Sequence, residues 1–475
     1  MHYTYLLMSE RDKRMARYAS EQQVGTAQAA IAGVRTSHRK ASKQRGSALL
    51  AAAFVLCSTA LRNRAAGAEV APGTVITSGT AAKAKGLLSP GVYWMVEHGM
   101  RIKVAPPSRL DWPPPYKEAT EKYSGQVRLS DDRRSLRGYA AGSPFPALDA
   151  NDPDFAVKLV WDSNFPPIYG DDFDTLLFDG QSQYVRPGKP QFLIEHFVEG
   201  HYAGYNEVGR TEVEPMPIDP DFLTSGRLWM TMSGPQIEPQ SGRGNSIVRY
   251  RYADPGRGDD AWTWSAGSRR LRRLNEAMLN SATDANVSDA DHGSGFNPKV
   301  EQYDYKFLAE KSILMPVNVA DIPLPICPYD GGATFCPVNW ELRHAYIVEA
   351  RPRWGQAHGA PNTLESRNVL YFDSEMLYPF IIDSYNRAGE LWRAIVNYGS
   401  WRDRSTPQAR VAIYPFKREL IPGNVFMDIL GGFSTAFAGP TRDAASSSRY
   451  DSWYINMGAV DKFFFTTESL ARMAP

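Results

Sequence analysis

The chain has 475 residues, 12% of them aromatic, and a formal net charge of +1. This length allows a large core and one to three domains, and many aromatic residues with dispersed Gly and Pro favour a β-rich protein over a helical bundle. Beyond residue 68 there remain 42 basic and 49 acidic residues, from chain totals of 53 and 52, so this part carries a net charge of −7. Such a mildly acidic body argues against a nucleic-acid partner, which needs a basic surface.

The N-terminal 68 residues have the order of a secretory signal. A basic stretch at 39–45 precedes the apolar run 48–61, and the small residues 66–68 follow. Charged, apolar and small residues in this order predict export with cleavage after Ala68. The apolar run of about 14 residues is short for a membrane span, although an uncleaved anchor is the alternative. Residues 1–33 exceed what such a signal needs, and we expect the true start to lie downstream of them.

Export determines how the cysteines are interpreted. Cys57 lies in the predicted signal, which leaves Cys327 and Cys336 in the mature chain. An oxidising compartment would let this pair close a short disulfide loop. Two unpaired thiols are the alternative, and two thiols alone make a poor metal site.

Residues 69–150 are predicted to form an N-terminal arm with short helices. Ser89 as the cap, Pro90 as the first helical residue and Gly99 as the stop predict one helix. Residues 116–123 predict a second. The remaining residues, 151–475, are predicted to form one β-rich body with loop insertions.

Strand patterns recur along this body, with a polar hairpin turn at 254–260. The predicted strands are 155–161, 192–198, 228–232, 247–252, 262–264, 303–307, 313–317, 340–350 and 369–372.

The strand predicted at 340–350 alternates between apolar and polar residues. Leu342, Tyr346 and Val348 share one face with His344, whereas Arg343 belongs to the opposite, polar face together with its acidic neighbours. This alternation is typical of a half-buried antiparallel strand. We therefore expect His344 to be a core residue rather than a catalytic base.

Residues 371–396 predict three strands joined by turns at 373–376 and 386–389. Their apolar residues lie on both faces, with Phe380 and Ile382 pointing one way and Ile381 the other. A strand with one solvated face would alternate, so each face of this meander must contact a helix, another sheet or an apolar ligand.

An apolar ligand would need a lining, and six residues of these strands are candidates for it. They are Tyr346, Val348, Phe380, Ile382, Trp392 and Ile395. The alternative for each of them is ordinary core between the sheet and a helix.

The densest charge cluster of the mature chain comprises four arginines, Arg269, Arg270, Arg272 and Arg273. One interpretation is a docking patch for an anionic headgroup or a partner protein. The other is a solvated strand end whose arginines pair with Asp259 and Asp260.

No pattern for catalysis, a cofactor or a metal is found. The acidic loop 284–291 lacks the Gly and Glu of a calcium-binding loop, and His196 and His201 are five residues apart, without metal-ligand spacing. Gly432-Phe-Ser-Thr-Ala lacks the last Gly of a nucleophile elbow, and phosphate-binding and dinucleotide-binding motifs are absent. We therefore expect no catalytic residues and no cofactor. A hydrolase whose site assembles only in three dimensions, around His196, His201 or His344, is kept as an alternative.

Several ordered segments resemble one family. They are residues 116–123, 142–146, 262–273, 295–297, 340–344 and 371–393, and together they resemble the domain-of-unknown-function 1329 (DUF1329) family. The meander is also similar to that of LolA/LolB/RseB-type lipoprotein carriers and sensors. The resemblance implies an open antiparallel half-barrel with helices covering an apolar concave face.

The same resemblance implies a place and a role. It implies the periplasm of a Gram-negative cell, handling of a hydrophobic small molecule or lipid, and no established catalytic residues. It also implies an RND-type exporter and an outer-membrane barrel protein as partners. The sequence therefore predicts a lipid carrier or adaptor, with a non-catalytic sensor or scaffold as the alternative.

Overall fold

The computed structural model describes residues 70–190, 192–275, 287–292, 295–353, 363–402, 416–439, 453–456, 458 and 460–473. All the described residues belong to one compact unit, and the predicted signal lies outside them. Within the described ranges, every helix is too short or too polar to cross a membrane.

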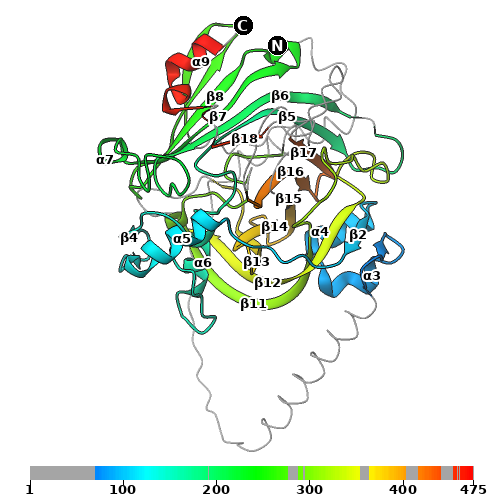
Figure 1. Ribbon diagram of the computed structural model, residues 1–475. Coiled ribbons are helices and arrows are strands. Elements are labelled where there is room, and N and C mark those ends of the chain that lie inside the picture. Colours follow the sequence, from blue (N-terminus) through cyan, green and yellow to red (C-terminus); the bar gives the residue numbers. More distant parts are fainter. Residues whose placement is uncertain are drawn as a thin grey trace, which may run out of the picture. The chain divides into compact units, whose positions relative to one another are not determined.

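One large sheet dominates this unit (Figure 1). Its strands are β1 (Val75–Ile76), β2 (Ile102–Ala105), β5 (Asp172–Tyr184), β6 (Ile194–Asn206), β7 (Arg227–Glu238), β8 (Ser246–Tyr252), β9 (Asp260–Ser265), β10 (Arg270–Leu274), β11 (Tyr303–Met315), β12 (Val338–Pro352), β13 (Arg367–Asp373), β14 (Tyr378–Tyr385), β15 (Leu391–Arg402), β16 (Arg418–Asp428), β17 (Phe433–Ala438) and β18 (Trp453–Ile455). β3 (Arg128–Leu129) and β4 (Leu136–Arg137) form a separate small hairpin.

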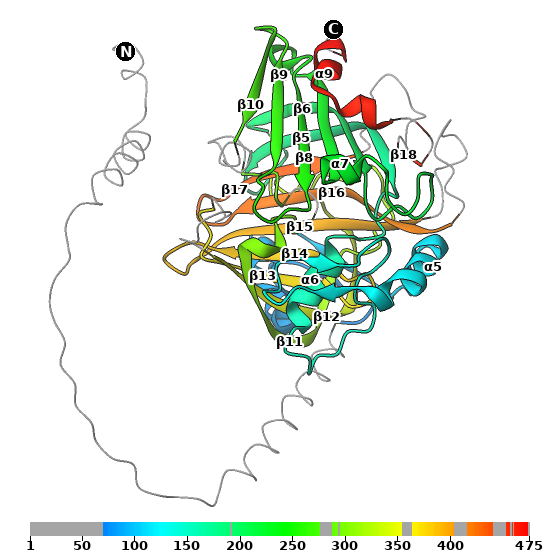
Figure 2. The same ribbon diagram turned by 90° about the vertical axis from the view of Figure 1, so that its left-hand side faces the viewer.

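The strand order of the large sheet is β1-β2-β12-β13-β14-β15-β16-β17-β5-β6-β7-β8-β9-β10, with β11 on β12 and β18 on β5. Only the β2–β12 pair is parallel among these described pairings. The two ends of this order do not pair with each other, so the predicted open, mostly antiparallel sheet is confirmed. Figure 2 shows β8, β9 and β10 side by side at one end of it.

Short helices accompany the sheet. They are α3 (Ala81–Ala84), α4 (Pro90–Glu97), α5 (Pro114–Tyr123), α6 (Phe155–Ser163), α7 (Phe222–Ser225) and α9 (Thr467–Met473), with 3₁₀ turns η1 (Lys85–Leu87), η2 (Ser124–Gln126), η3 (Gln240–Gly242), η4 (Val300–Gln302) and η5 (Lys462–Phe465). The two helices predicted in the N-terminal arm are α4 and α5. Ser89 caps α4 by accepting a hydrogen bond from the Val92 N–H, as its position before Pro90 predicts.

The strand predicted at 155–161 is wrong, because these residues form α6. Phe155, Ala156, Leu159 and Val160 are buried, and this spacing places them on one face of a helix. A short apolar run does not by itself distinguish a strand from a buried helix. The contact of α6 with β11 decides between them.

The two strands predicted at 303–307 and 313–317 are parts of one strand, β11. Its middle, from Leu308 to Ser312, is mostly exposed and polar, and a β-bulge falls between Phe307 and Ala309. Exposure of one sheet edge and the bulge interrupt the apolar pattern without ending the strand.

The predicted meander is present as β13, β14 and β15, and a helix covers each face. Ile381 of β14 and its partner Val396 of β15 belong to the cluster of buried apolar residues that contains Val92 of α4. The next pair, Ile382 and Ile395, faces the other way and belongs to the cluster that contains Phe155 of α6. Both apolar faces are thus explained by the protein's own helices.

The prediction that Phe380 and Ile382 share a face is wrong. A bulge in β14 pairs Tyr371 with Ile381 but Phe372 with Pro379, so Phe380 has no partner on β13. The bulge breaks the two-residue alternation, and Phe380 packs with the α4 cluster while Ile382 packs with the α6 cluster.

Around His344, the more buried face of β12 is the opposite of the predicted one, although Val348 farther along is buried. His344 is exposed and lies 3.2 Å from a Glu310 carboxylate oxygen, so it is not a core residue. Arg343 is buried instead, with Nε 2.7 Å from Asp373 and Nη2 2.7 Å from Glu375. A buried charge is tolerated when it is paired, and the chain supplies both carboxylates from β13 and its turn.

Asp383 of β14 anchors the N-terminus of α4. Its Oδ1 accepts hydrogen bonds from the Ser89 hydroxyl (3.1 Å) and the Gly91 N–H (3.2 Å). Burial raises the pKa of this carboxyl to about 7, although the hydrogen bonds from Gly91 and Ser89 act in the opposite direction.

The raised pKa of Asp383 predicts a pH-dependent stability. The native state favours the protonated acid, so its contribution is complete below the ordinary value of 3.8 and is lost as the pH rises to about 7. The free energy of unfolding of wild type relative to Asp383→Asn should fall by roughly 2–3 kcal/mol from pH 5 to pH 7. Urea denaturation across this range measures the difference, and parallel curves would contradict the prediction.

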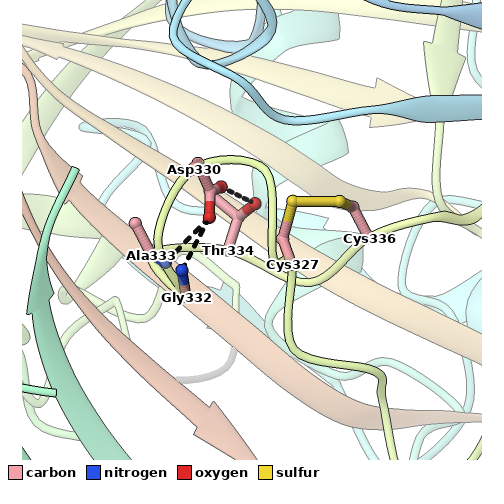
Figure 3. Close-up of a disulfide and its surroundings, with 6 residues drawn as sticks. All are labelled: Cys327, Asp330, Gly332, Ala333, Thr334 and Cys336. Atoms are coloured by element: carbon pink, nitrogen blue, oxygen red, sulfur yellow. Dashed lines mark hydrogen bonds between the residues drawn. A yellow bond between two sulfur atoms is a disulfide. The ribbon is translucent and has the colours of Figure 1, made fainter. Parts of the chain in front are cut away.

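Cys327 and Cys336 form the predicted disulfide. Inside its loop, Asp330 accepts hydrogen bonds from the N–H groups of Gly332 and Ala333 and from the Thr334 hydroxyl (Figure 3). These bonds join Asp330 to three successive residues of the loop.

Removing the disulfide should lower stability measurably. On the chain-entropy model a loop of this size is worth about 2–3 kcal/mol. The double variant Cys327→Ser/Cys336→Ser should therefore unfold at a lower urea concentration than wild type. A reductant should lower the urea midpoint of wild type and leave that of the double variant unchanged. An unchanged midpoint in the variant would show that the loop's hydrogen bonds suffice.

Candidate functional site

A cavity of about 600 Å³ lies against one face of β5, β6, β7 and β8. Directly paired residues on neighbouring antiparallel strands share a face. Two such rows line the cavity, Phe173–Gly204–Thr231–Arg249 and Thr175–Tyr202–Ser233–Ile247. One continuous sheet face therefore forms this wall.

Other walls come from connecting segments. Residues 164–171, which follow α6, line the cavity, and so do Tyr116 of α5 and Tyr139. The Tyr116 hydroxyl donates a hydrogen bond to the Phe165 carbonyl (2.7 Å), and the Tyr139 and Phe165 rings lie 4.1 Å apart. These contacts fix the connecting segments to each other.

The lining is rich in aromatic side chains, which provide large contact areas at a small cost in side-chain entropy. They are Tyr116, Tyr139, Phe165, Tyr169, Phe173, Phe178, Tyr202, Trp229, Tyr378 and Phe437. Gly204 makes room for one of them, because a Cβ there would lie 2.4 Å from the Phe173 ring.

The charged residues that line the cavity have partners within the protein. Asp171 accepts hydrogen bonds from three backbone N–H groups, at 2.7–2.8 Å, and Glu212 lies 2.7 Å from the Arg418 guanidinium. The two others, Arg249 and Asp289, are also ion-paired.

For Arg249, the ion pairs stabilise the charged form. Burial lowers the pKa of Arg249, but the nearby carboxylates of Asp291 and Asp259 raise it overall. An ionised ligand group placed deep inside would therefore find no unpaired counter-charge among the described lining residues and would lose its hydration.

One buried polar group on the wall lacks a partner. The Tyr378 hydroxyl has no hydrogen bond to any described residue, and burial raises its pKa well above the ordinary value. The neighbouring Tyr169 hydroxyl, by contrast, donates to the Ile421 carbonyl (2.8 Å).

The structure brings three of the six predicted lining residues together, but not in the cavity. Val348, Ile382 and Ile395 lie in one cross-strand row through Leu370, and α6 packs over them. Tyr346 packs at the edge of the same cluster. These residues are core because α6 fills the space that the sequence assigned to a ligand.

Two predicted lining residues lie elsewhere again. Phe380 is in the core on the opposite face of the sheet. Trp392 is half-buried, with the Arg393 guanidinium 4.1 Å from its ring centre.

The cavity lies on the same sheet face as α6, farther along the strand order. Ile395 pairs with Phe426 of β16, and Asn424, two residues earlier, shares that face and lines the cavity. α6 thus covers one part of this face, and the chain directly after it borders the hollow part. Sequence reasoning predicted strands at 228–232 and 247–252 but not that they line a cavity, because Trp229, Thr231 and Ser233 form a partly polar face that resembles a solvent-exposed one.

The arginine cluster divides between the two faces of β10. Arg273 forms an ion pair with Asp260 on one face, and Arg270 and Arg272 belong to the other. Asp259 does not pair with this cluster, because its carboxylate contacts Arg249 and Arg251. The predicted pairing with nearby acids thus holds for Arg273 alone among the described contacts.

The polar contacts of the described histidines are with carboxylates or backbone rather than with a serine. His201 lies 3.4 Å from the Asp174 carboxylate, and the His196 side chain is outside the described residues. Between described side chains, no hydrogen bond joins a serine to a histidine.

The acidic loop is only partly described. Asp289 contacts His292 and Arg393, while residues 284 and 286 lie outside the described ranges. In the portion of the chain with assigned positions, no group of His, Cys, Asp and Glu is arranged to hold a metal.

A comparison with protein-family models shows which family the chain belongs to. A family model described as "Protein of unknown function (DUF1329)" matches residues 75–415. The chain belongs to this family. No curated protein matches this DUF1329 protein.

Three solved structures are similar to this DUF1329 protein at 12% identity each. A putative outer membrane lipoprotein-sorting protein domain from Vibrio parahaemolyticus matches 64% of this chain and 92% of its own, with a TM-score of 0.38. A DUF1329 family protein from Desulfovibrio piger matches 63% of this chain and 92% of its own, with a TM-score of 0.39. A LolA superfamily protein from Nitrosomonas europaea matches 63% of this chain and 91% of its own, with a TM-score of 0.32.

Proposed function

We propose that this protein is a periplasmic carrier or adaptor that binds a lipid-like hydrophobic molecule in the cavity beside β5–β8. The observation that carries the proposal is a hollow of about 600 Å³ with ten aromatic side chains on its walls and its charges paired. Ligand sites commonly have this size and are mainly apolar with a few polar groups.

Binding of this kind needs no catalytic residue. Burying one methylene group contributes about 0.8 kcal/mol, so an acyl chain of some 16 carbons could supply roughly 10 kcal/mol before the costs of association. Shape and apolar contact are therefore sufficient for affinity.

Two features support a periplasmic location. Residues 39–68 have the order of a secretory signal, and the Cys327–Cys336 disulfide suits an oxidising compartment. Cooperation with an RND-type exporter and an outer-membrane barrel protein belongs to the same proposal. Crosslinking in intact cells, followed by mass spectrometry, would identify such partners.

Ligand uptake tests the proposal directly. Delipidated mature protein should increase the fluorescence of N-phenyl-1-naphthylamine at micromolar concentrations, and a lipid should displace the dye. Mass spectrometry of the molecule that copurifies with the mature chain would identify the natural ligand class. Failure to take up dye or lipid would overturn the carrier proposal and favour a scaffold.

A further inference from the structure

The cavity-side face continues to β10, the last strand in the order of the described sheet. Ile247 pairs with Thr263 of β9, which pairs with Arg272 of β10. The adjacent row runs from Arg249 through Ala261 to Leu274. Because Ile247, Arg249 and Leu274 line the cavity, Arg272 and Arg270 stand on the same face, just beyond its rim.

The charge on this edge differs from the charge inside the cavity. Arg270 and Arg272 are exposed, and neither forms an ion pair with a described acidic residue. Arg249, deeper on the same face, is neutralised by Asp259 and Asp291. From β8 to β10, the uncompensated positive charge of the described face therefore lies at the rim.

The spacing suits one ligand that reaches from the rim into the hollow. Residues two apart on a strand are about 6.6 Å apart, so both guanidinium groups can approach one anion. Arg272 lies two strands from Ile247, a distance of about 9.5 Å. Leu274 and the partly exposed Ile247 provide apolar contacts between the arginines and the cavity.

We propose that Arg270 and Arg272 bind the anionic headgroup of an amphiphile whose apolar chain occupies the cavity. This inference rests on the proposed carrier function and adds the charge of the ligand and the position of its headgroup. A carboxylate or phosphate stays hydrated at the rim, where Arg can bind it, while the chain is buried among aromatic rings.

Matched ligands and variants test the headgroup site. Laurate and methyl laurate have the same chain, and only laurate is charged, so their displacement of the dye is compared at pH 8. The double variant Arg270→Gln/Arg272→Gln should bind laurate about five-fold more weakly than wild type and methyl laurate equally well. Arg273→Gln, on the opposite face of the same strand, should leave both affinities unchanged.

Each outcome has a distinct meaning. A 0.5 M salt solution should weaken laurate binding by wild type and leave laurate binding by the double variant unaffected, because salt screens exposed charges.

If the double variant binds laurate as wild type does, or loses affinity for laurate and methyl laurate equally, the headgroup site is wrong and the carrier proposal stands. If inorganic phosphate displaces the dye as well as laurate does, the arginines bind free anions and the inference fails. If wild type binds neither laurate nor its ester, the carrier proposal itself fails.

Discussion

Thr231→Trp should weaken binding of an apolar ligand at least ten-fold while the protein remains folded. Thr231 lies in the middle of the cavity wall, between Gly204 of β6 and Arg249 of β8. An indole there would occupy space that the ligand needs. Exclusion of two methylene groups costs about 1.6 kcal/mol, slightly more than the 1.4 kcal/mol that corresponds to a ten-fold change. Dye titration measures the affinity.

A tryptophan placed away from the cavity provides the control. Leu308 lies on β11 and is 43% exposed, and β11 contributes no residue to the cavity lining. Leu308→Trp should bind dye as wild type does. Unchanged affinity in Thr231→Trp, with an unchanged melting temperature, would place the ligand outside this cavity.

Gly91→Ala should destabilise the protein by roughly 3–5 kcal/mol. A Cβ at Gly91 would lie 2.3 Å from Ala394 Cβ and 2.4 Å from Asp383 Oδ1, whereas carbon atoms in contact are normally about 3.5–4.0 Å apart. Both neighbours belong to the central strands, so α4 has to move away. Overpacking costs about 1–3 kcal/mol, and loss of the hydrogen bonds to Asp383 adds about 1.5–3 kcal/mol.

Gly86→Ala is the matched control for this substitution. Gly86 lies in η1, a few residues before α4, and a Cβ there would meet nothing within 4 Å. Its replacement should be neutral or slightly stabilising in urea denaturation. If Gly91→Ala were equally neutral, close packing of α4 on β14 and β15 would not be a source of stability.

The positions of α4 and α6 determine which part of the sheet face is left open to a ligand. α4 fills one face of the meander and α6 fills the other, so the hollow part of the sheet is next to them, at β5–β8. An apolar strand pattern predicted that something covers these faces. It did not distinguish a helix from a ligand, because each removes the same apolar surface from water.

Local patterns were sufficient for features that depend on neighbouring residues. Ser89-Pro90 predicted the start of α4, and the Cys327–Cys336 pair predicted its disulfide. The absence of alternation in 371–396 predicted a meander buried on both faces, and ordered segments predicted the family.

Tertiary structure alone decided the remaining features. Contact with β11 makes 155–163 a helix, and carboxylates from β13 and its turn bury Arg343 and leave His344 exposed. Pairing across four strands, from β7 to β10, places Arg272 beside the cavity. The physical reason is that sequence periodicity reports which side of a backbone each side chain occupies. Whether the space on that side is filled depends on the volumes and charges of segments far away in the chain.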